Sequence, residues 1–369
     1  RELGLRFEWT VSLCRVVSTH RELPRPFKRY AIGPVWRYER PSEKRFREFW
    51  QADADIVGVA DPIADAEILA VAVDCLRRVG FEGFLIRLND RRILEALVEL
   101  VGLPGDRSLE IFRAVDKLSK IGVEGVMEEL AGLGASEEAS RRLLELTASR
   151  GEPEETLEEA REILRGLAVG LSGCDALSSI VEYAAAFGIE SHIVVDLSLA
   201  RGLDYYTGPV YEIYAEGFEG YGSIAGGGRY DDLIELFGGD PTPATGISLG
   251  VERIVTLLEG REAFDGLSLG ALVYVAAASD AVRGKAVEVA QMLRRAGVAT
   301  DLDLMGRSLS RQLDYANRRG FRRVVIVGER ELREGCVAVR DMEVAEQRTV
   351  RLEDLVGYLK SGSSKQMQG

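Results

Sequence analysis

The 369-residue sequence predicts an α+β fold, in which an antiparallel sheet domain carries a helical insertion and is followed by a small α/β domain. Three observations predict it. Residues 27–57 have the pattern of two strands around a turn, residues 91–187 have the composition of helices, and residues 272–327 alternate between strand and helix patterns. At roughly 150 residues per domain, the chain is long enough for two or three domains.

The first strand-rich segment is a hairpin. From Phe27 to Val57, β-branched and aromatic residues lie on both sides of the turn sequence Pro-Ser-Glu-Lys, which predicts two long antiparallel strands. Residues 65–80 have apolar residues at helical spacing and end in glycine, so we expect a helix there. Residues 84–88 form the next strand.

The following hundred residues change in character. Residues 91–187 are rich in Leu, Glu and Arg, are broken by Gly and Pro near residues 102–105 and 151–153, and have no strand pattern. They predict an all-helical insertion. Strands resume over residues 192–214, and a glycine-rich stretch then leads into a helix at residues 251–258.

The C-terminal part alternates regularly. The patterns predict strands at residues 272–277, 300–304 and 323–327, with helices at 282–296 and 308–319 between them. No G-x-G-x-x-G follows the first of these strands, and the chain contains no G-x-x-x-x-G-K-[ST]. Neither a dinucleotide site nor a P-loop is indicated.

Composition excludes several classes of function. No apolar run approaches the roughly 20 residues that span a bilayer, which argues against a membrane protein. The four cysteines are scattered singly, which fits a reducing cytoplasm better than a disulfide framework or a zinc site. With only two histidines, no metal site and no Ser-His-Asp chemistry is expected. The first residues have neither Met nor a secretory signal and suggest the boundary of a fragment.

The net charge of −13 argues against a nucleic-acid partner, but the charge is unevenly distributed. Residues 21–47 contain nine Lys or Arg against three acids, and residues 306–333 contain eight Arg against three acids. Such runs are usually solvated faces of helices and strands. The first run differs because aromatic residues are interleaved with its charges.

The hairpin carries the first candidate site. Arg37 and Arg40 precede the turn, and Arg45, Arg47 and Phe49 follow it. Because alternate residues of a strand share a face, the last three are expected to point together. Guanidinium groups beside an aromatic ring suit a nucleoside triphosphate. A surface sheet whose arginines pair with acids elsewhere is at least as consistent with the composition.

Three further motifs lie downstream. Residues 201–208 (RGLDYYTG) combine an Arg with paired tyrosines, and residues 226–231 (GGGRYD) form a loop where backbone can approach a ligand. Residues 246–254 (GISLGVERI) are a small-residue strand that enters a helix. Each motif alone is weak, because glycine-rich turns and tyrosine pairs are common.

In combination these motifs resemble a known family. Residues 33–51 resemble motif 2 of class II aminoacyl-tRNA synthetases, and residues 246–253 resemble motif 3. Residues 201–208 and 226–231 are similar to the two signatures of histidyl-tRNA synthetases. Their residue pattern is closest to that of the archaeal and eukaryotic-like branch. The motifs occur in the family's order, with a helical insertion between the second motif and the first signature.

The resemblance implies roles for particular residues. It implies that ATP is held by Arg37, Arg45, Phe49 and Arg253. It implies that histidine is held by Glu8, Thr10, Gln51, Asp55, Tyr205 and Tyr206. Arg37 and Arg201 would be catalytic, with Arg201 stabilising charge on the α-phosphate where many relatives use a metal ion. No covalent nucleophile is needed, because the substrate carboxylate attacks directly.

The resemblance also implies a domain plan and partners. A class II catalytic domain would comprise residues 1–90 and 188–264, interrupted by the helical insertion 91–187, and an anticodon-binding α/β domain would span residues 269–362. Contacts to tRNA(His) are expected from Arg307, Arg311, Arg318 and Arg322. ATP would come with Mg²⁺, and the protein would be cytoplasmic and would form a homodimer when the N-terminal segment that carries motif 1 is present.

Two departures from the family's pattern stand out. Motif 1, which supports the dimer, is missing, and Trp9 replaces the family's usual residue between Glu8 and Thr10. An alternative also stays open, namely a non-catalytic paralogue that binds histidine, such as the regulatory subunit of ATP phosphoribosyltransferase. That paralogue typically lacks the C-terminal domain and loses the ATP arginines.

Overall fold

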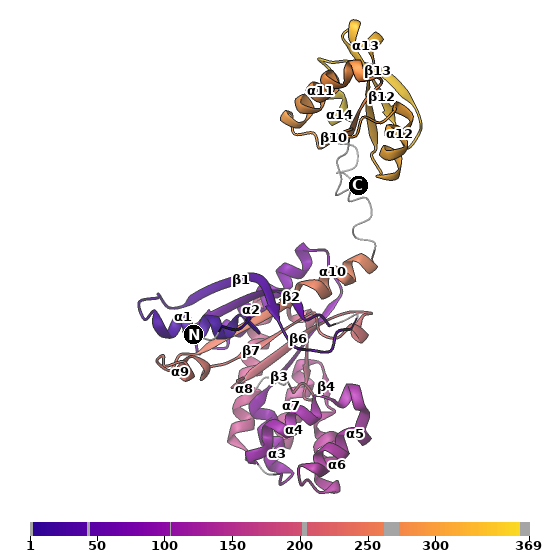
Figure 1. Cartoon of the computed structure of the whole chain (residues 1–369). Helices are drawn as coiled ribbons and strands as arrows, with labels where there is room; N and C mark the ends of the chain where they lie inside the picture. Colours follow the sequence, from indigo (N-terminus) through magenta and orange to yellow (C-terminus); the bar gives the residue numbers. More distant parts are fainter. Residues whose placement is uncertain (1–2, 43–44, 104, 201–204, 262–272, 362–369) are drawn as a thin grey trace. The chain divides into compact units, whose positions relative to one another are not determined.

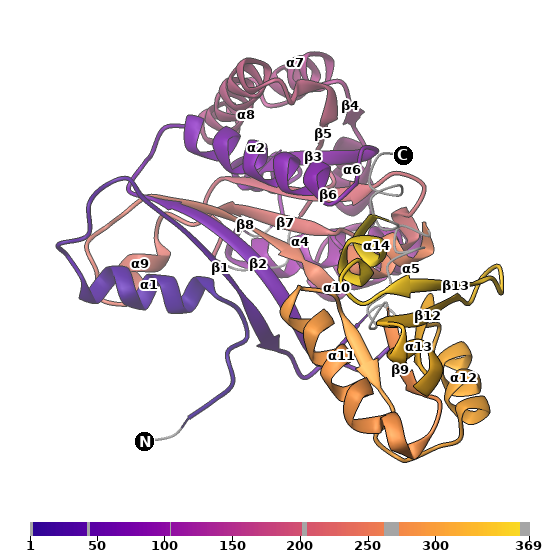
Figure 2. The same ribbon diagram turned by 90° about the horizontal axis from the view of Figure 1, so that it is seen from above.

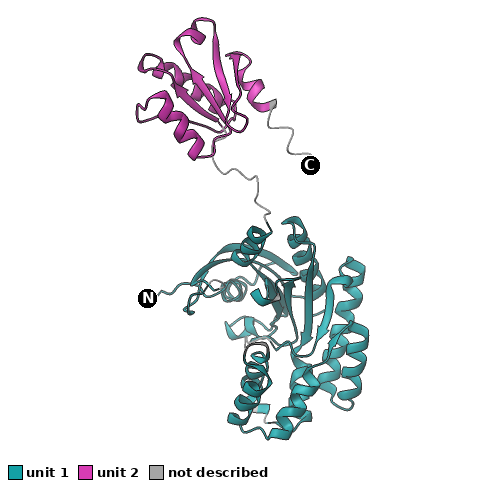
Figure 3. Cartoon of the chain, turned by 90° about the vertical axis from the view of Figure 1, so that its right-hand side faces the viewer, with its two compact units in different colours: residues 1–263 teal, residues 264–369 magenta. Residues whose placement is uncertain are grey.

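The computed structural model describes residues 3–42, 45–103, 105–200, 205–261 and 273–361 (Figure 1). The chain divides into two compact units, residues 1–263 and 264–369, which Figure 3 colours separately. Each unit has its own sheet and its own buried apolar cluster.

The sheet of unit 1 has eight strands in the order β1-β2-β8-β7-β6-β3-β5-β4. Their bounds are β1 Phe27–Trp36, β2 Glu48–Val57, β3 Phe84–Asp90, β4 Arg150–Gly151, β5 Ile193–Asp196, β6 Pro209–Ala215, β7 Ala225–Arg229 and β8 Ala244–Gly250. All neighbouring strands are antiparallel except β3 and β5, which are parallel. The predicted antiparallel sheet is therefore confirmed, with one parallel pair.

The predicted hairpin between Phe27 and Val57 is also confirmed. β1 and β2 pair in continuous register from Phe27 opposite Val57 to Trp36 opposite Glu48. β1 is an edge strand of the sheet, because β2 is its one neighbour in the strand order. Its partner β2 lies between β1 and β8 and is therefore held on both sides.

The two faces of β2 are chemically different. Ala52, Ala54 and Ile56 belong to the apolar core, which is covered by α2 (Ile63–Arg78) and α8 (Ala168–Phe187). Figure 2 shows these two helices beside each other along the sheet. The alternate residues 51, 53 and 55 are polar and face the other way, although they are buried too. This second face of the sheet carries the candidate site.

The insertion is built from helices that pack on the β3 end of the sheet. In order they are α3 Arg91–Leu100, α4 Ser108–Val115, α5 Leu118–Gly132, α6 Glu137–Thr147, α7 Pro153–Ile163 and α8. The prediction that the insertion is all-helical is wrong at one point, because β4 pairs with β5 through Arg150 opposite Asp196. A strand of two residues has no alternation to detect, so its pattern is invisible in the sequence.

Three other helices complete unit 1, namely α1 Thr10–Thr19, α9 Leu233–Leu236 and α10 Val251–Gly260. Helix α10 begins directly after β8 ends, so it starts at the edge of the sheet, as the sequence predicts. Within the described ranges, the chain has no helix with the length and apolar character needed to cross a bilayer.

Unit 2 is the predicted α/β domain. Its elements are β9 Val273–Ala277, α11 Arg283–Arg295, β10 Thr300–Leu302, α12 Leu309–Arg318, β11 Arg323–Val327, α13 Glu329–Arg333, β12 Cys336–Asp341, β13 Gln347–Arg351 and α14 Leu355–Ser361. The strand order is β10-β9-β11-β12-β13, with the first three strands parallel. The predicted alternation is confirmed, and β12 and β13 extend the sheet by an antiparallel hairpin that was not predicted.

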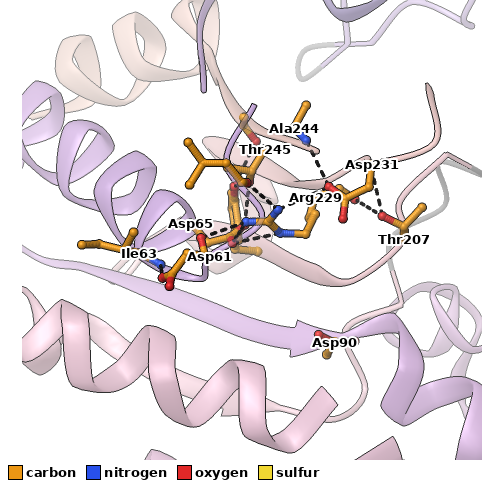
Figure 4. A network of polar contacts seen from close by, with 12 residues as sticks. Asp61, Ile63, Asp65, Asp90, Thr207, Arg229, Asp231, Ala244 and Thr245 are labelled. Atoms are coloured by element: carbon orange, nitrogen blue, oxygen red, sulfur yellow. Dashed lines mark hydrogen bonds and ion pairs between the residues drawn. The ribbon is translucent and has the colours of Figure 1, made fainter. Parts of the chain in front are cut away.

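A buried ion pair ties the central strands of unit 1 to α2 (Figure 4). Asp65 of α2 is fully buried, and its carboxylate accepts hydrogen bonds from the Arg229 guanidinium of β7 and from the Thr245 hydroxyl of β8. The same guanidinium donates to the carbonyl of Val59 at 2.9 Å and contacts the carboxylate of Asp231. The pair and its hydrogen bonds thus fix three elements against one another.

We predict that Arg229→Ala destabilises unit 1 by about 3–5 kcal/mol, because it leaves the buried Asp65 carboxylate without its counter-charge. Urea denaturation followed by circular dichroism measures the change. Arg141→Ala is the matched control, since the Arg141–Glu137 pair is exposed and should contribute less than about 1 kcal/mol. Equal effects of the two substitutions would contradict the role assigned to the buried pair.

Candidate active site

One cavity of about 480 Å³ opens on the polar face of the sheet in unit 1. It is walled by the segment before α1, by β2, by strands β6 to β8 and by the first turn of α10, and the insertion contributes Asp116. Glycines form part of its floor. A side chain at Gly246 would collide with the Asp55 carboxylate on this face of the sheet. Backbone at the floor therefore lies open to a ligand.

Ten of the residues that the sequence singled out line this cavity. They are Glu8, Thr10, Arg37, Arg45, Phe49, Gln51, Asp55, Tyr205, Tyr206 and Arg253. They come from separate segments of the chain, so the fold brings them together. Arg201 lies outside the described residues, and Arg307, Arg311, Arg318 and Arg322 belong to unit 2.

One end of the cavity is acidic. Gln51, Asp53 and Asp55 alternate along β2 and point into the cavity together. Asp55 has an exposed fraction of 4% and forms an ion pair with Arg29 of β1 at 2.8 Å. Its other oxygen accepts a hydrogen bond from the Tyr230 hydroxyl at 2.5 Å. Burial raises the pKa of Asp55, and both of these contacts act in the opposite direction.

Asp53 has a different environment. Burial raises its pKa to about 7, and the neighbouring Asp55 carboxylate adds to the shift, whereas the Ser248 hydroxyl across the strand pair opposes it. Asp53 was not predicted as a site residue. Alternation along β2 places it on the same face as Gln51 and Asp55, so the pattern that was used for those two residues was sufficient to find it.

Glu8 completes the acidic end. It lies in the segment before α1, is buried, and accepts a hydrogen bond of 2.8 Å from the Tyr205 hydroxyl. Burial and the nearby Tyr206 and Glu8 raise the pKa of Tyr205, so this phenol stays protonated and remains a donor. Trp9 does not line the cavity, since its ring packs against Gly33 of β1. The departure from the family's pattern at this position therefore does not alter the cavity wall.

The other end of the cavity carries guanidinium groups. The Arg37 guanidinium lies 4.4 Å from the centre of the Phe7 ring and 5.0 Å from that of Phe49. Arg253, near the start of α10, donates to the carbonyl of Ser223. Burial lowers the pKa of Arg253, while the carboxylate of Glu212 opposes this. Neither Phe7 nor Glu212 was predicted from the sequence.

One prediction for this end is wrong. Arg45 and Phe49 line the cavity, but Arg47 does not. Strand β2 begins only at Glu48, so strand alternation does not reach residues 45 and 47. The Arg47 guanidinium instead lies over the ring of Tyr38, with 4.8 Å between them, and donates to the carbonyl of Glu39.

The arginines of unit 2 lie on and around α12. Arg311 and Arg318 are seven residues apart in this helix, are exposed, and therefore share a side. Arg307 lines a second cavity of about 430 Å³, and its guanidinium lies 4.5 Å from the centre of the Tyr315 ring. Arg322, before β11, is half-buried and lies 3.6 Å from the Glu343 carboxylate.

Comparison with known proteins gives two family matches. Residues 1–254 match the model of histidyl-tRNA synthetases, and residues 272–362 match the model of an anticodon-binding domain. Together these matches span both compact units.

Several known proteins are similar along nearly the whole chain. The histidine–tRNA ligase of Pyrococcus furiosus is 37% identical over 98% of this chain and 83% of its own length. That of Korarchaeum cryptofilum is 42% identical over 96% of this chain and 81% of its own length. The crystal structure of histidyl-tRNA synthetase from a Nostoc species superposes with a TM-score of 0.79 at 29% identity, covering 97% of this chain and 83% of that one.

We predict that Asp53→Asn stabilises the protein more at pH 8 than at pH 5. The pKa of Asp53 is about 7 in the folded protein and 3.8 ordinarily, so the parent protein loses stability as the pH rises from 3.8 to 7. Asparagine does not ionise, so the variant avoids this loss. Because one pKa unit corresponds to about 1.4 kcal/mol, the difference between the two pH values should approach 3 kcal/mol.

Urea denaturation at both pH values measures the difference. Asp74→Asn, at an exposed position of α2, is the control and should change stability equally at pH 5 and pH 8. If Asp53→Asn also has the same effect at both values, the carboxyl of Asp53 ionises like that of an exposed aspartate.

Proposed function

The chain belongs to the histidyl-tRNA synthetase family, and from this membership we propose that it is a histidine–tRNA ligase. It activates histidine with ATP to histidyl-adenylate and then transfers the histidine to tRNA(His). In the first step the histidine carboxylate forms a bond to the α-phosphorus of ATP, and the bond to the leaving pyrophosphate breaks. The observation that carries the proposal is the convergence of ten family-implied residues on one cavity.

The acidic end suits the amino acid. Glu8, with Thr10 and Gln51 on the same cavity wall, would bind the α-ammonium group. Asp55, with Tyr205 and Tyr206, would bind the imidazole ring. A site that hydrogen-bonds a polar side chain rejects analogues that leave its buried groups unpaired, and this selects histidine over apolar amino acids.

The guanidinium end suits the triphosphate. Arg37 would hold the α-phosphate and the histidine carboxylate, which brings the two reacting groups together. Arg45 and Arg253 would hold the outer phosphates, and the Phe49 ring would stack on adenine. Arg201, which lies outside the described residues, would add positive charge where negative charge develops on the α-phosphate.

Mg²⁺ is expected to arrive with ATP. In the described part of the chain, no three His, Cys, Asp or Glu side chains are grouped to hold a metal ion. We therefore expect Mg²⁺ to be bound mainly by the phosphates of ATP. An ion bound in this way usually needs only one or two carboxylates from the protein. The carboxylate of Glu212 on the wall beside Arg253 would hold it, and the ion would supply charge that offsets the phosphates.

The alternative of a non-catalytic, histidine-binding paralogue is less well supported. That paralogue is expected to lack the C-terminal domain and the ATP arginines. This chain has a match to the anticodon-binding domain over residues 272–362, and Arg37, Arg45 and Arg253 line the same cavity as the acidic residues.

We assign residues 1–90 and 188–264 to catalysis, residues 91–187 to the insertion, and residues 269–362 to binding of the tRNA anticodon. Arg307, Arg311, Arg318 and Arg322 would contact tRNA phosphates and unstacked bases. The active form would be a cytoplasmic homodimer. Edge strand β1 supports the homodimer. Tyr30 and Ile32 have exposed fractions of 79% and 58%, and among the described residues β2 is the one strand that pairs with β1.

We predict histidine-dependent exchange of pyrophosphate into ATP, and we predict that Asp55→Ala raises the KM for histidine at least tenfold with little change in the KM for ATP. The physical reason is that the substitution removes a charged hydrogen-bond acceptor from the amino-acid end alone. Exchange kinetics with each substrate varied measure both constants. A parent protein that is folded, binds histidine and gives no exchange would instead support the non-catalytic paralogue.

We predict that removal of residues 265–369 leaves pyrophosphate exchange largely intact and abolishes charging at low tRNA concentration. Every residue assigned to histidine or ATP lies in unit 1, which has its own apolar core. Because contacts to phosphate release counterions, tRNA affinity of the whole chain should fall with salt, and the deletion should flatten that dependence. A truncated protein that charges tRNA with the parent's affinity and salt dependence excludes this role for unit 2.

A further inference from the structure

Phe7 lines the guanidinium end of the cavity, and the proposed function gives it no role. The centre of its ring lies 4.4 Å from the Arg37 guanidinium, and its carbonyl accepts a hydrogen bond of 3.4 Å from Arg37 Nε. A guanidinium within about 6 Å of a ring centre is attracted by the electrons of the ring. Phe7 therefore contacts Arg37 through both its side chain and its backbone.

A second ring contacts the same guanidinium. The centre of the Phe49 ring lies 5.0 Å from Arg37, and Phe49 belongs to β2, whereas Phe7 belongs to the segment before α1. Two separate segments thus restrict one guanidinium. A side chain that is ordered before it meets a ligand loses less conformational entropy on binding.

The backbone on both sides of Phe7 is fixed. The carbonyl of Arg6 accepts a hydrogen bond of 2.9 Å from the backbone N–H of Trp36, the last residue of β1. On the other side, the Glu8 carboxylate accepts from the Tyr205 hydroxyl at 2.8 Å. Contacts at residues 6 and 8 therefore set the place of residue 7 beside Arg37.

Apolar burial does not account for the position of this ring. Phe7 has an exposed fraction of 52%, so about half of the side chain remains in contact with water. Its contacts with Arg37 are what the position provides. An aromatic side chain that stays half-exposed beside a cavity arginine points to a role in the cavity.

We propose that Phe7 is a positioning residue for Arg37, whose guanidinium it holds in the orientation that receives the α-phosphate of ATP and the carboxylate of histidine. This inference rests on the proposed function, in which Arg37 binds these two groups. Phe7 acts through Arg37 and not on the reacting atoms.

The order of residues in this segment fits the reaction. Glu8 is proposed to bind the α-ammonium group of histidine, and Phe7 directly precedes it. In histidine the ammonium and carboxylate groups are attached to the same carbon atom. One short segment thus places the amino acid and supports the arginine that receives its carboxylate, which favours a fixed distance between the two reactants.

The size of the effect follows from the contact. A cation–π contact changes an equilibrium about 2- to 5-fold at an exposed site and about 30-fold where water is excluded. Bound substrates would cover the Arg37 guanidinium, so the effect in the reacting complex should exceed that at an exposed site. Displacement of such a group by about 1 Å can lower a rate about 100-fold, which sets the upper limit.

Two substitutions separate the ring from its bulk. In pyrophosphate exchange, Phe7→Leu should lower kcat about 5- to 30-fold. The KM values for histidine and ATP should stay within a few-fold of the parent's, because the residues proposed to bind the ammonium, imidazole and adenine groups are unchanged. Phe7→Tyr keeps the ring and should restore the parent's kcat. Phe187→Leu, at the exposed end of α8, is the matched control and should leave kcat unchanged.

A double-mutant cycle tests whether Phe7 acts through Arg37. Formation of the adenylate in a single turnover, with protein in excess over ATP, measures the slow rate expected of Arg37→Ala. Phe7→Leu should cause no further loss in Arg37→Ala protein, because the ring then has no guanidinium to hold. A merely structural role would lower the rate by the same factor in both backgrounds. Urea denaturation shows whether each variant is folded.

A parent-like kcat in folded Phe7→Leu protein would overturn the inference and leave the proposed function standing. An equal loss of kcat in Phe7→Tyr would also overturn it, as would an equal loss in the parent and Arg37→Ala backgrounds. Failure of the proposed function has a different signature, namely a folded parent protein without any histidine-dependent exchange, and this result would remove the inference as well.

Discussion

The buried pair of Asp65 and Arg229 is the interaction on which the arrangement of unit 1 depends most. Strand β7 is made largely of glycine and contributes little side-chain packing, while β8 adds Ile247 and Leu249 to the apolar core between small residues. Polar contacts also fix both strands relative to α2, because Arg229 of β7 and Thr245 of β8 both bind the Asp65 carboxylate. Taking two charges out of water is costly, and their attraction compensates only if the geometry is well satisfied. The pair therefore favours one arrangement of these strands over others.

That arrangement lets the cavity floor consist of backbone. Because the pair holds β7 and β8 from the core side, the opposite face can have glycine where a side chain would collide with the cavity wall, as at Gly246 opposite Asp55. The walls then supply charge of opposite sign at the two ends, with Glu8, Asp53 and Asp55 at one and Arg37, Arg45 and Arg253 at the other. The proposed substrates match these charges, because the ammonium and imidazole groups of histidine would lie at the acidic end and the phosphates of ATP at the guanidinium end.

The sequence predicted the parts of the fold that have long, regular patterns. The hairpin of β1 and β2 and the alternation in unit 2 were found because apolar residues repeat over many positions. Strand β4 was missed because two residues carry no period. Arg47 was placed on the wrong face because the strand begins one residue after it, and the position of a strand end depends on pairing with distant residues. Most of the candidate site was found through the family's motifs. Asp53 was missed although it alternates with Gln51 and Asp55 along β2, whereas Phe7 and Glu212 are recognised only when the segments are assembled.

Asp53 illustrates how such a site can reduce stability in favour of selectivity. Apolar residues alternate with Gln51, Asp53 and Asp55 along β2, and an apolar side chain at position 53 would avoid the cost of burying a carboxyl group. An apolar floor, however, would accept rings of similar size whether or not they carry nitrogen. A site whose buried polar groups stay unpaired with the wrong ligand discriminates far more strongly than one that relies on shape. Burial raises the pKa of Asp53 to about 7, so its carboxyl lowers the stability of the folded protein as the pH rises, on the same polar face of β2 that lines the cavity.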